Sequence, residues 1–319
     1  MTDATAPAWK LWGALGTVYL VWGSTYLAIR VMVETVPPLL GAGTRFTVAG
    51  AVMLAVLSAR RSIRPTRAQL LSALLVGALL PGANAVVSVA EQEVPSGLTA
   101  LLIASVPLWV ILLRRAAGEP ASRASVGAVL VGFAGVALLL RPGEQSGDAT
   151  LLGLAACVAA AVMWASGSFA SPRLQLPRDG LVSTGWQMLL GGVVIVVAGL
   201  VAGEAPQVDP GAFSLRSVLA LSYLIVFGSW VAFTAYAWLL QNAPISRVST
   251  YAYVNPVVAI FLGWLILDEV ITVVTIVGAA IIVVSVALVV RIESGRRATP
   301  APRRAARRAS TARSASVYE

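Results

Sequence analysis

Long apolar stretches separated by short polar segments run along most of the chain. A hydropathy window of about 19 residues predicts ten apolar segments, at 11–33, 38–58, 69–90, 96–113, 124–141, 149–170, 181–202, 217–240, 245–266 and 270–291. As helices rising about 1.5 Å per residue, they are long enough to cross about 30 Å of hydrocarbon. Their apolar positions do not alternate, as they would in the strands of a membrane barrel. The pattern predicts an all-α membrane protein with ten transmembrane helices.

The composition agrees with lipid as the main solvent. Apolar residues make up 58% of the 319 residues and charged residues 12%, about half the charged share of a typical soluble domain. The net charge of +9 would suit nucleic-acid binding, but the basic residues lie in short loops and in the C-terminal tail, between apolar segments. No basic groove interleaved with aromatic side chains can be assembled from them, so we expect no nucleic-acid partner.

The basic residues also predict the orientation. Ten spans place both termini on one side, and placing that side in the cytoplasm puts Lys10 and most of the arginines there. Cytoplasmic loops of membrane proteins carry such an excess of lysine and arginine. The predicted organisation is a cytoplasmic N-terminal tail at 1–10, membrane regions at 11–141 and 149–291, and a cytoplasmic tail at 292–319.

The tail at 292–319 is rich in arginine, alanine, serine and proline and lacks apolar periodicity. It is predicted to be disordered and to rest on anionic membrane lipid; a regulatory role is the alternative.

Three scarce residue types exclude several chemistries. The sequence has no histidine, a single cysteine (Cys157) and a single lysine (Lys10, near the N-terminus). Metal sites built from histidine or clustered cysteine, intrachain disulfides and a phosphate-binding loop ending in lysine are therefore excluded. We expect no metal, no cofactor and no enzymatic activity.

The two halves of the chain repeat a common pattern. Trp22-Gly23-Ser24 matches Trp164-Ala165-Ser166, Arg45 falls on Gln187, and Pro95 and Pro107 fall on Pro244 and Pro256, each 149 residues later. Each half holds five predicted spans, so the second copy enters the membrane from the opposite side. Inverted repeats of this kind are typical of secondary transporters, whose substrate sites lie near the midplane. A structural duplication without transport is the alternative.

Several segments resemble the EamA family of the drug/metabolite transporter superfamily. They are Trp22-Gly23-Ser24-Thr25-Tyr26, the stretch AEQEVPSGLTALLIASVPLW at 90–109, and the stretch STYAYVNPVVAIFLGWLILDE at 249–269. The second is most similar to the YedA-like exporters. The resemblance implies ten helices in two EamA repeats, a central cavity lined by spans 1, 3, 4, 6, 8 and 9, and export of small metabolites, often amino acids or their analogues. A nearly neutral cavity lined by aromatic residues would also suit amphiphilic solutes, including drugs.

Polar and aromatic residues within the predicted spans are the candidates for a solute site, because polar groups in a membrane need a reason to be there. On the first span, Tyr19, Trp22, Tyr26 and Arg30 share one helical face, although such a stripe also suits helix packing. The predicted cavity residues are Tyr19, Trp22, Thr25, Tyr26, Asn84, Trp164, Ser168, Gln187, Trp230, Tyr253 and Asn255.

A buried ion pair and two helix kinks complete the set. Arg45 lies within the second span and Glu91 at the outer end of the third, so we expect them to pair, with Glu91 also the candidate for proton coupling. The alternatives are that Arg45 extends to the membrane interface without a partner, and that transport is facilitative, without coupling to protons. Pro107 and Pro256 should each free a backbone carbonyl one turn earlier, facing either a cavity or a packed kink.

The sequence as a whole favours an inner-membrane exporter of a small-molecule solute, either monomer or homodimer. A membrane sensor or accessory protein that binds its ligand without transporting it is the alternative.

Overall fold

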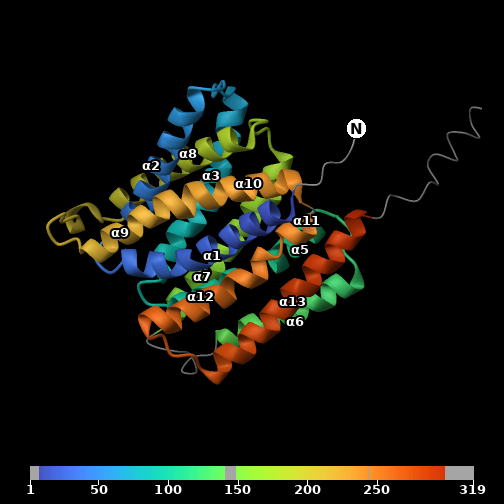
Figure 1. The fold of residues 1–319 in the computed structure, drawn as a ribbon. Coiled ribbons are helices and arrows are strands. Elements are labelled where there is room, and N and C mark those ends of the chain that lie inside the picture. Colours follow the sequence, from blue (N-terminus) through green and yellow to red (C-terminus); the bar gives the residue numbers. More distant parts are fainter. Residues whose placement is uncertain (1–6, 141–148, 244, 299–319) are drawn as a thin grey trace, which may run out of the picture.

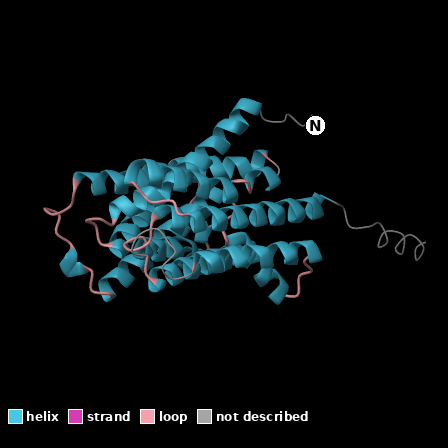
Figure 2. Cartoon of the chain, turned by 90° about the horizontal axis from the view of Figure 1, so that it is seen from below, coloured by secondary structure: helices cyan, strands magenta, loops and turns pink. Residues whose placement is uncertain are grey.

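The computed structural model describes residues 7–140, 149–243 and 245–298, and every element within them is helical (Figures 1 and 2). In chain order the elements are α1 (Ala8–Met32), α2 (Pro38–Ser58), α3 (Arg67–Ala90), α4 (Ser96–Ile103), α5 (Val106–Ala116), α6 (Arg123–Leu139), α7 (Leu151–Ala170), η1 (Ser171–Arg173), α8 (Gly180–Val201), η2 (Ala205–Gln207), α9 (Leu215–Tyr223), η3 (Leu224–Val231), α10 (Ala232–Asn242), α11 (Ile245–Val248), α12 (Tyr251–Leu267) and α13 (Val273–Ala298).

The helices coincide with the ten predicted apolar segments. By length and composition, seven helices could cross a membrane: Pro38–Ser58, Arg67–Ala90, Ser96–Ala116, Leu151–Arg173, Gly180–Val201, Leu215–Leu240 and Val273–Glu293. Arg123–Leu139 and Tyr251–Leu267 are apolar but shorter. The all-α fold is confirmed over the described residues, whereas the count of ten spans stays a prediction.

The predicted tails are only partly described. Residues 1–6 and 299–319 lie outside the described residues, and α13 continues to Ala298, past the expected end of the last span.

Following the predicted orientation, we call the end of the bundle that holds Glu91 and Glu269 the outer end. The opposite end, with Lys10 and Arg173, is the inner end.

Three of the predicted spans are interrupted rather than continuous. The fourth divides into α4 and α5 at Ala104–Ser105, directly before Pro107, which lacks the N–H needed to continue the helix. The ninth divides into α11 and α12 at Ser249–Thr250, while Pro256 lies inside α12. The eighth contains a π-helical turn, η3 (Leu224–Val231), which no local sequence signal predicted.

Contacts between the halves recur when the halves are exchanged. Helix α2 packs against its counterpart α8, and α6 against its counterpart α13. Helix α3 packs along α7, as α9, η3 and α10 pack along α1; likewise α4 and α5 contact α7, as α12 contacts α1. This reciprocity is what two repeats related by a two-fold axis would produce.

Glycines bring the central helices into backbone contact. A methyl group on Gly191 of α8 would lie 2.4 Å from the carbonyl oxygen of Gly77 on α3, and one on Gly192 would lie 2.4 Å from the backbone nitrogen of Thr47 on α2. Small residues permit such close approach between membrane helices. Gly191 and Gly192 therefore serve helix packing.

Candidate functional site

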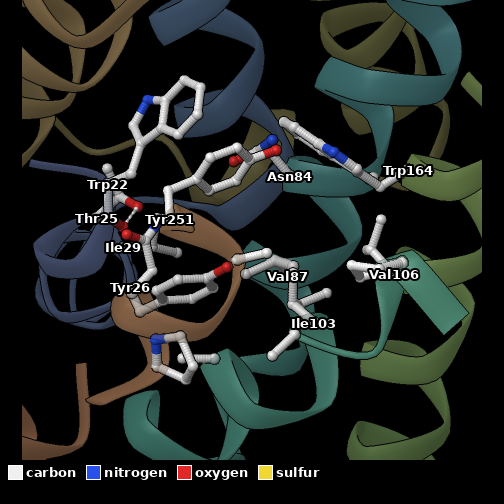
Figure 3. A pocket seen from close by; sticks show the side chains of 18 of the residues that line it. Trp22, Thr25, Tyr26, Ile29, Asn84, Val87, Ile103, Val106, Trp164 and Tyr251 are labelled. Carbon is white, nitrogen blue, oxygen red and sulfur yellow. Dashed lines mark hydrogen bonds between the residues drawn. The ribbon is translucent and has the colours of Figure 1, made fainter. Parts of the chain in front are cut away.

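A central cavity of about 120 Å³ lies between the two halves (Figure 3). Helices α1, α2, α3, α4 and α5 line it from the first half, and α7, α10 and α12 from the second. Its lining is mainly apolar, with tryptophan, tyrosine and asparagine side chains from facing helices. Small-molecule sites are usually apolar clefts, often between helices, that contain a few polar groups.

Most of the predicted cavity residues do line this cavity. They are Trp22, Thr25, Tyr26, Asn84, Trp164 and Asn255, joined by Arg45, Pro107 and Pro256. Ile103 and Ala252, the residues one turn before the two prolines, line it too. The cavity is also lined by Tyr251, Phe233 and Phe46, which the sequence did not lead us to expect. Their aromatic side chains within predicted spans were the one feature that could have marked them as candidates.

Five predicted cavity residues lie elsewhere in this structure. Tyr19 and Thr250 share a hydrogen bond through their hydroxyl groups, and Ser168 is exposed one turn beyond Trp164. Gln187 donates to Ser183 at 2.8 Å beside a smaller neighbouring cavity.

The other two are Trp230, which lies within an interruption, and Tyr253, which follows one. A continuous helix, as predicted from the sequence, would contain neither interruption. Trp230 lies in the π-helical turn and donates its indole N–H to the carbonyl of Ala49 at 2.9 Å. Tyr253 follows the break between α11 and α12 and packs against the apolar cluster that contains Leu98. Each interruption changes which residues of the following segment share a face.

Aromatic side chains form one wall of the cavity. The Trp22 ring lies 5.1 Å from the Phe233 ring, 5.1 Å from the Tyr236 ring and 5.2 Å from the Tyr251 ring. These separations are typical of edge-to-face and tilted aromatic pairs. The cluster joins α1, α10 and α12 on the inner side of the cavity.

The π-helical turn makes room for Arg45. The guanidinium Nε donates to Ser229 Oγ at 3.2 Å, and Ser229 in turn donates to the carbonyl of Leu224, five residues earlier, at 3.0 Å. A methyl group on Gly228 would lie 3.1 Å from an Arg45 terminal nitrogen. Arg45 also lies over the Phe46 ring, 4.6 Å from its centroid.

The expected Arg45–Glu91 pair is absent, so that prediction is wrong for this structure. Among the described residues, Arg45 forms no ion pair, although its side chain is only 4% exposed. Both carboxylate oxygens of Glu91 are buried without a hydrogen-bond partner there. Arg30 donates instead to the backbone carbonyl of Glu91. A buried charge without a counter-charge is costly, which makes Arg45 ready to receive an anionic group.

Two asparagines add polarity to the cavity. Asn84 donates to the carbonyl of Leu80 at 3.3 Å. Asn255 is buried, and its Oδ1 has no hydrogen-bond partner among the described residues. Buried acceptors are nearly always satisfied, so the Asn255 oxygen is available to a donor that enters the cavity.

At the outer end, Glu269 joins the two halves. Its carboxylate accepts hydrogen bonds from the backbone N–H groups of Ser96, at 2.7 Å, and Gly97, at 3.1 Å. These groups begin α4, where the helix dipole favours negative charge. Glu204 binds the start of α2 in the same way, through the N–H groups of Leu39 and Leu40.

Replacing Glu269 by alanine should destabilise the protein by about 2–3 kcal/mol. The substitution leaves two buried N–H donors without their charged acceptor, and hydrogen bonds to charged groups are worth about that much. Unfolding by graded addition of denaturing detergent measures the change. Glu34→Ala is the matched control, because Glu34 is exposed and its ion pair with Arg216 is long, at 3.9 Å. Equal losses of stability in the two variants would contradict the role assigned to Glu269.

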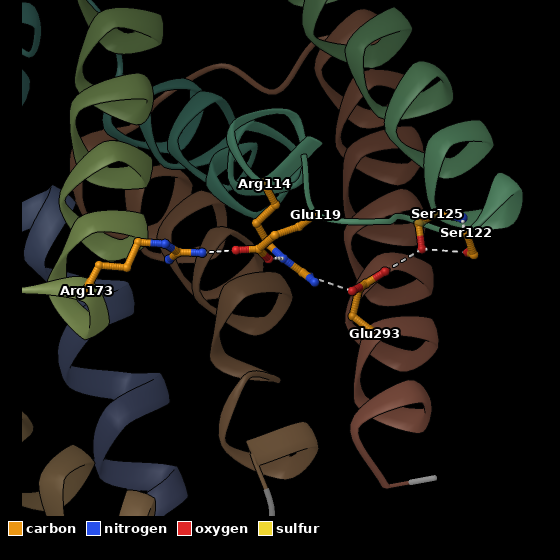
Figure 4. Close-up of polar contacts among 6 residues, drawn as sticks. All are labelled: Arg114, Glu119, Ser122, Ser125, Arg173 and Glu293. Atoms are coloured by element: carbon orange, nitrogen blue, oxygen red, sulfur yellow. Dashed lines mark hydrogen bonds and ion pairs between the residues drawn. The ribbon is translucent and has the colours of Figure 1, made fainter. Parts of the chain in front are cut away.

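A charge network joins the halves at the inner end (Figure 4). Arg114 binds Glu119 at 2.7 Å and Glu293 at 2.6 Å, and Glu119 also pairs with Arg173 in η1, which follows α7. Ser125 donates to Glu293 at 2.7 Å. The hydrogen bond from Arg114 lowers the pKa of Glu119 below its ordinary value.

The sequence profile of the EamA-like transporter family matches this chain twice, over residues 9–141 and 151–291. The chain belongs to this family. The two matches correspond to the two halves that exchange contacts in the fold. Membership establishes the protein as a membrane transporter with the EamA two-repeat architecture.

Individual EamA relatives agree with this assignment. The chain is 40% identical over 255 residues to a protein named uncharacterized inner membrane transporter YedA of Escherichia coli strain K12, covering 79% of this chain and 81% of that protein. It is 25% identical over 271 residues to the uncharacterized transporter YoaV of Bacillus subtilis strain 168, covering 83% and 91%. A crystal structure 23% identical in sequence has a TM-score of 0.60, covering 90% of this chain and 98% of that one, and supports the fold.

Proposed function

We propose that this EamA protein is a secondary transporter of the inner membrane that exports a small organic metabolite, an amino acid or a close analogue. In this proposal the protein crosses the membrane ten times and has both termini in the cytoplasm. The observation that supports this most strongly is the pairing of two unsatisfied groups in one cavity: Arg45, which has no counter-charge, and the Asn255 oxygen, which has no donor among the described residues.

An amino acid would complement both groups. Its carboxylate would receive the Arg45 guanidinium, its ammonium group would donate to Asn255 Oδ1, and an apolar side chain would lie against the aromatic wall. The cavity of about 120 Å³ is smaller than the roughly 300 Å³ at which drug-sized sites begin. This size favours a small metabolite over an amphiphilic drug.

Alternating access would move the solute. The cavity lies between repeats that contact each other at both ends, and rocking of one repeat against the other would expose it to one side at a time. Selective binding to each conformation would then set the direction of net movement.

Counterflow uptake in proteoliposomes tests the proposal. Purified full-length protein is reconstituted, and labelled amino acids are tested one at a time, with the same unlabelled compound inside. Saturable accumulation of one chemical class supports the proposal, and a matched amine without the carboxylate should not compete. Ligand-dependent stabilisation without any uptake would instead indicate a membrane sensor, and would overturn transport.

A further inference from the structure

Glu91 is a fully buried acid that the proposed solute site does not use. It directly follows the last residue of α3 and has 0% exposure, and neither of its carboxylate oxygens has a hydrogen-bond partner among the described residues. The nearby acid Glu93 is exposed and binds the Thr150 hydroxyl. A charged carboxylate without partners in such surroundings is strongly disfavoured.

The groups around Glu91 come from several elements. Arg30 on α1 directs its guanidinium to the Glu91 backbone carbonyl rather than to the carboxylate. Tyr26 on α1 and Cys157 on α7 interact with Glu91 electrostatically, as does Glu269 from the α12–α13 connection. Among these described residues, Arg30 is the cation and Glu269 the second acid that interact with Glu91.

The charges balance when one of the two acids is neutral. Glu269 accepts two backbone N–H groups at the start of α4, and helix N-termini favour negative charge. Among the described residues, Glu91 receives no such donors. With Glu91 protonated, one cation, Arg30, stands with one carboxylate, Glu269.

We propose that Glu91 is a proton-binding site, and that the outer end of the bundle closes only when its carboxyl group carries a proton. The inference rests on the transport function proposed above. In the arrangement described here, α4 contacts α1, α7 and α12, and Glu91 is 0% exposed. Opening the outer end would admit water, allow the carboxyl to ionise beside Arg30, and release the proton to the outside.

The proposal ties solute movement to external pH. Tyr26 lines the cavity and also interacts with Glu91, so the proton site adjoins the solute site. Closure of the outer end takes up a proton from outside and opening returns it there, so a low external pH favours the closed outer end.

Thiol labelling tests the site without any solute. Ile29 lines the cavity from α1 and is 1% exposed. Ile29→Cys in a Cys157→Ala background gives a single reporter, labelled from outside in spheroplasts with a membrane-impermeant maleimide. Dividing each rate by that of the same reporter carrying Glu91→Gln removes the pH dependence of the thiol itself.

The expected result is a ratio that rises about tenfold from about pH 6 to about pH 8.5, because the parent loses its proton and opens while the glutamine variant stays neutral and closed. Glu93→Gln, as the control, should behave like the parent, and Glu91→Asp should keep the pH dependence if Glu91→Gln fails to reach the membrane. A flat ratio overturns the proposal.

Counterflow on the same variants separates this proposal from the transport proposal. Uptake by the wild type combined with a flat labelling ratio would reject the proton site alone. A pH-dependent ratio in a protein that gives no counterflow would retain the proton site and reject transport.

Discussion

Gly191→Ala should sharply reduce the amount of folded protein recovered from the membrane. The added methyl group would lie 2.4 Å from the Gly77 carbonyl oxygen and 2.9 Å from its Cα. Both atoms belong to backbone, so α3 and α8 must separate to admit it. Overpacking in well-packed cores costs about 1–3 kcal/mol, and we expect at least the upper end of that range here.

The measurement is the monodisperse fraction after detergent extraction, together with the midpoint of thermal unfolding. Gly127→Ala provides the control, since a methyl group there would meet nothing within 4 Å. Gly77→Ala should reproduce the defect from the facing helix, where the new methyl would lie 2.4 Å from the Gln187 carbonyl oxygen. Normal recovery of Gly191→Ala would mean that α3 and α8 do not touch through their backbones.

Hydropathy was sufficient to predict where the helices lie, because each apolar segment must cover about the same thickness of lipid. It could not place the interruptions. Pro107 indicated the break between α4 and α5, since proline removes a helix hydrogen bond. The π-helical turn at Leu224–Val231 contacts a side chain from another helix, Arg45, which occupies the space beside Gly228 and binds Ser229. A contact between distant segments leaves no local signal in the sequence.

The contrast between regular helices and interruptions also explains which candidate site residues were placed correctly. Trp22 and Tyr26 lie on an uninterrupted helix, where spacing alone places them on one face, and both line the cavity. Trp230 lies within the π-helical turn and Tyr253 follows the break between α11 and α12, so regular helical spacing fails at both. Arg45 and Glu91 were expected to pair because of their opposite charges and similar depth. In the structure Arg45 donates to Ser229 instead, and Arg30 donates to the backbone carbonyl of Glu91. The similar depth of Arg45 and Glu91 does not specify which faces of α2 and α3 meet.

The proposed solute site and the proposed proton site are separate. Arg45 lies at the cavity and Glu91 at the outer end, so a solute and a proton would meet different groups. Glu269 binds the start of α4 at the same outer end. This arrangement lets each event be tested by its own substitution.

Arg45→Ala should reduce solute uptake roughly 30-fold or more without lowering the amount of folded protein. Truncating one partner of a buried, hydrogen-bonded charge pair costs about 2–5 kcal/mol, and each 1.4 kcal/mol is about tenfold. The guanidinium lines the cavity and is 4% exposed, so water cannot replace it cheaply as the partner of a carboxylate. Arg45→Lys keeps the charge but loses the planar guanidinium and its contact with Ser229, and should fall in between.

Competition identifies the group that Arg45 recognises. In the wild type, an amino acid should displace labelled solute far better than the amine that lacks its carboxylate, whereas Arg45→Ala should treat the two nearly alike. Arg216→Ala, which removes an exposed arginine 3.9 Å from Glu34, should preserve the wild-type preference. If Arg45→Ala lowers uptake of every compound equally and keeps the preference, then Arg45 supports the π-helical turn rather than the solute, and the carboxylate must bind elsewhere in the cavity.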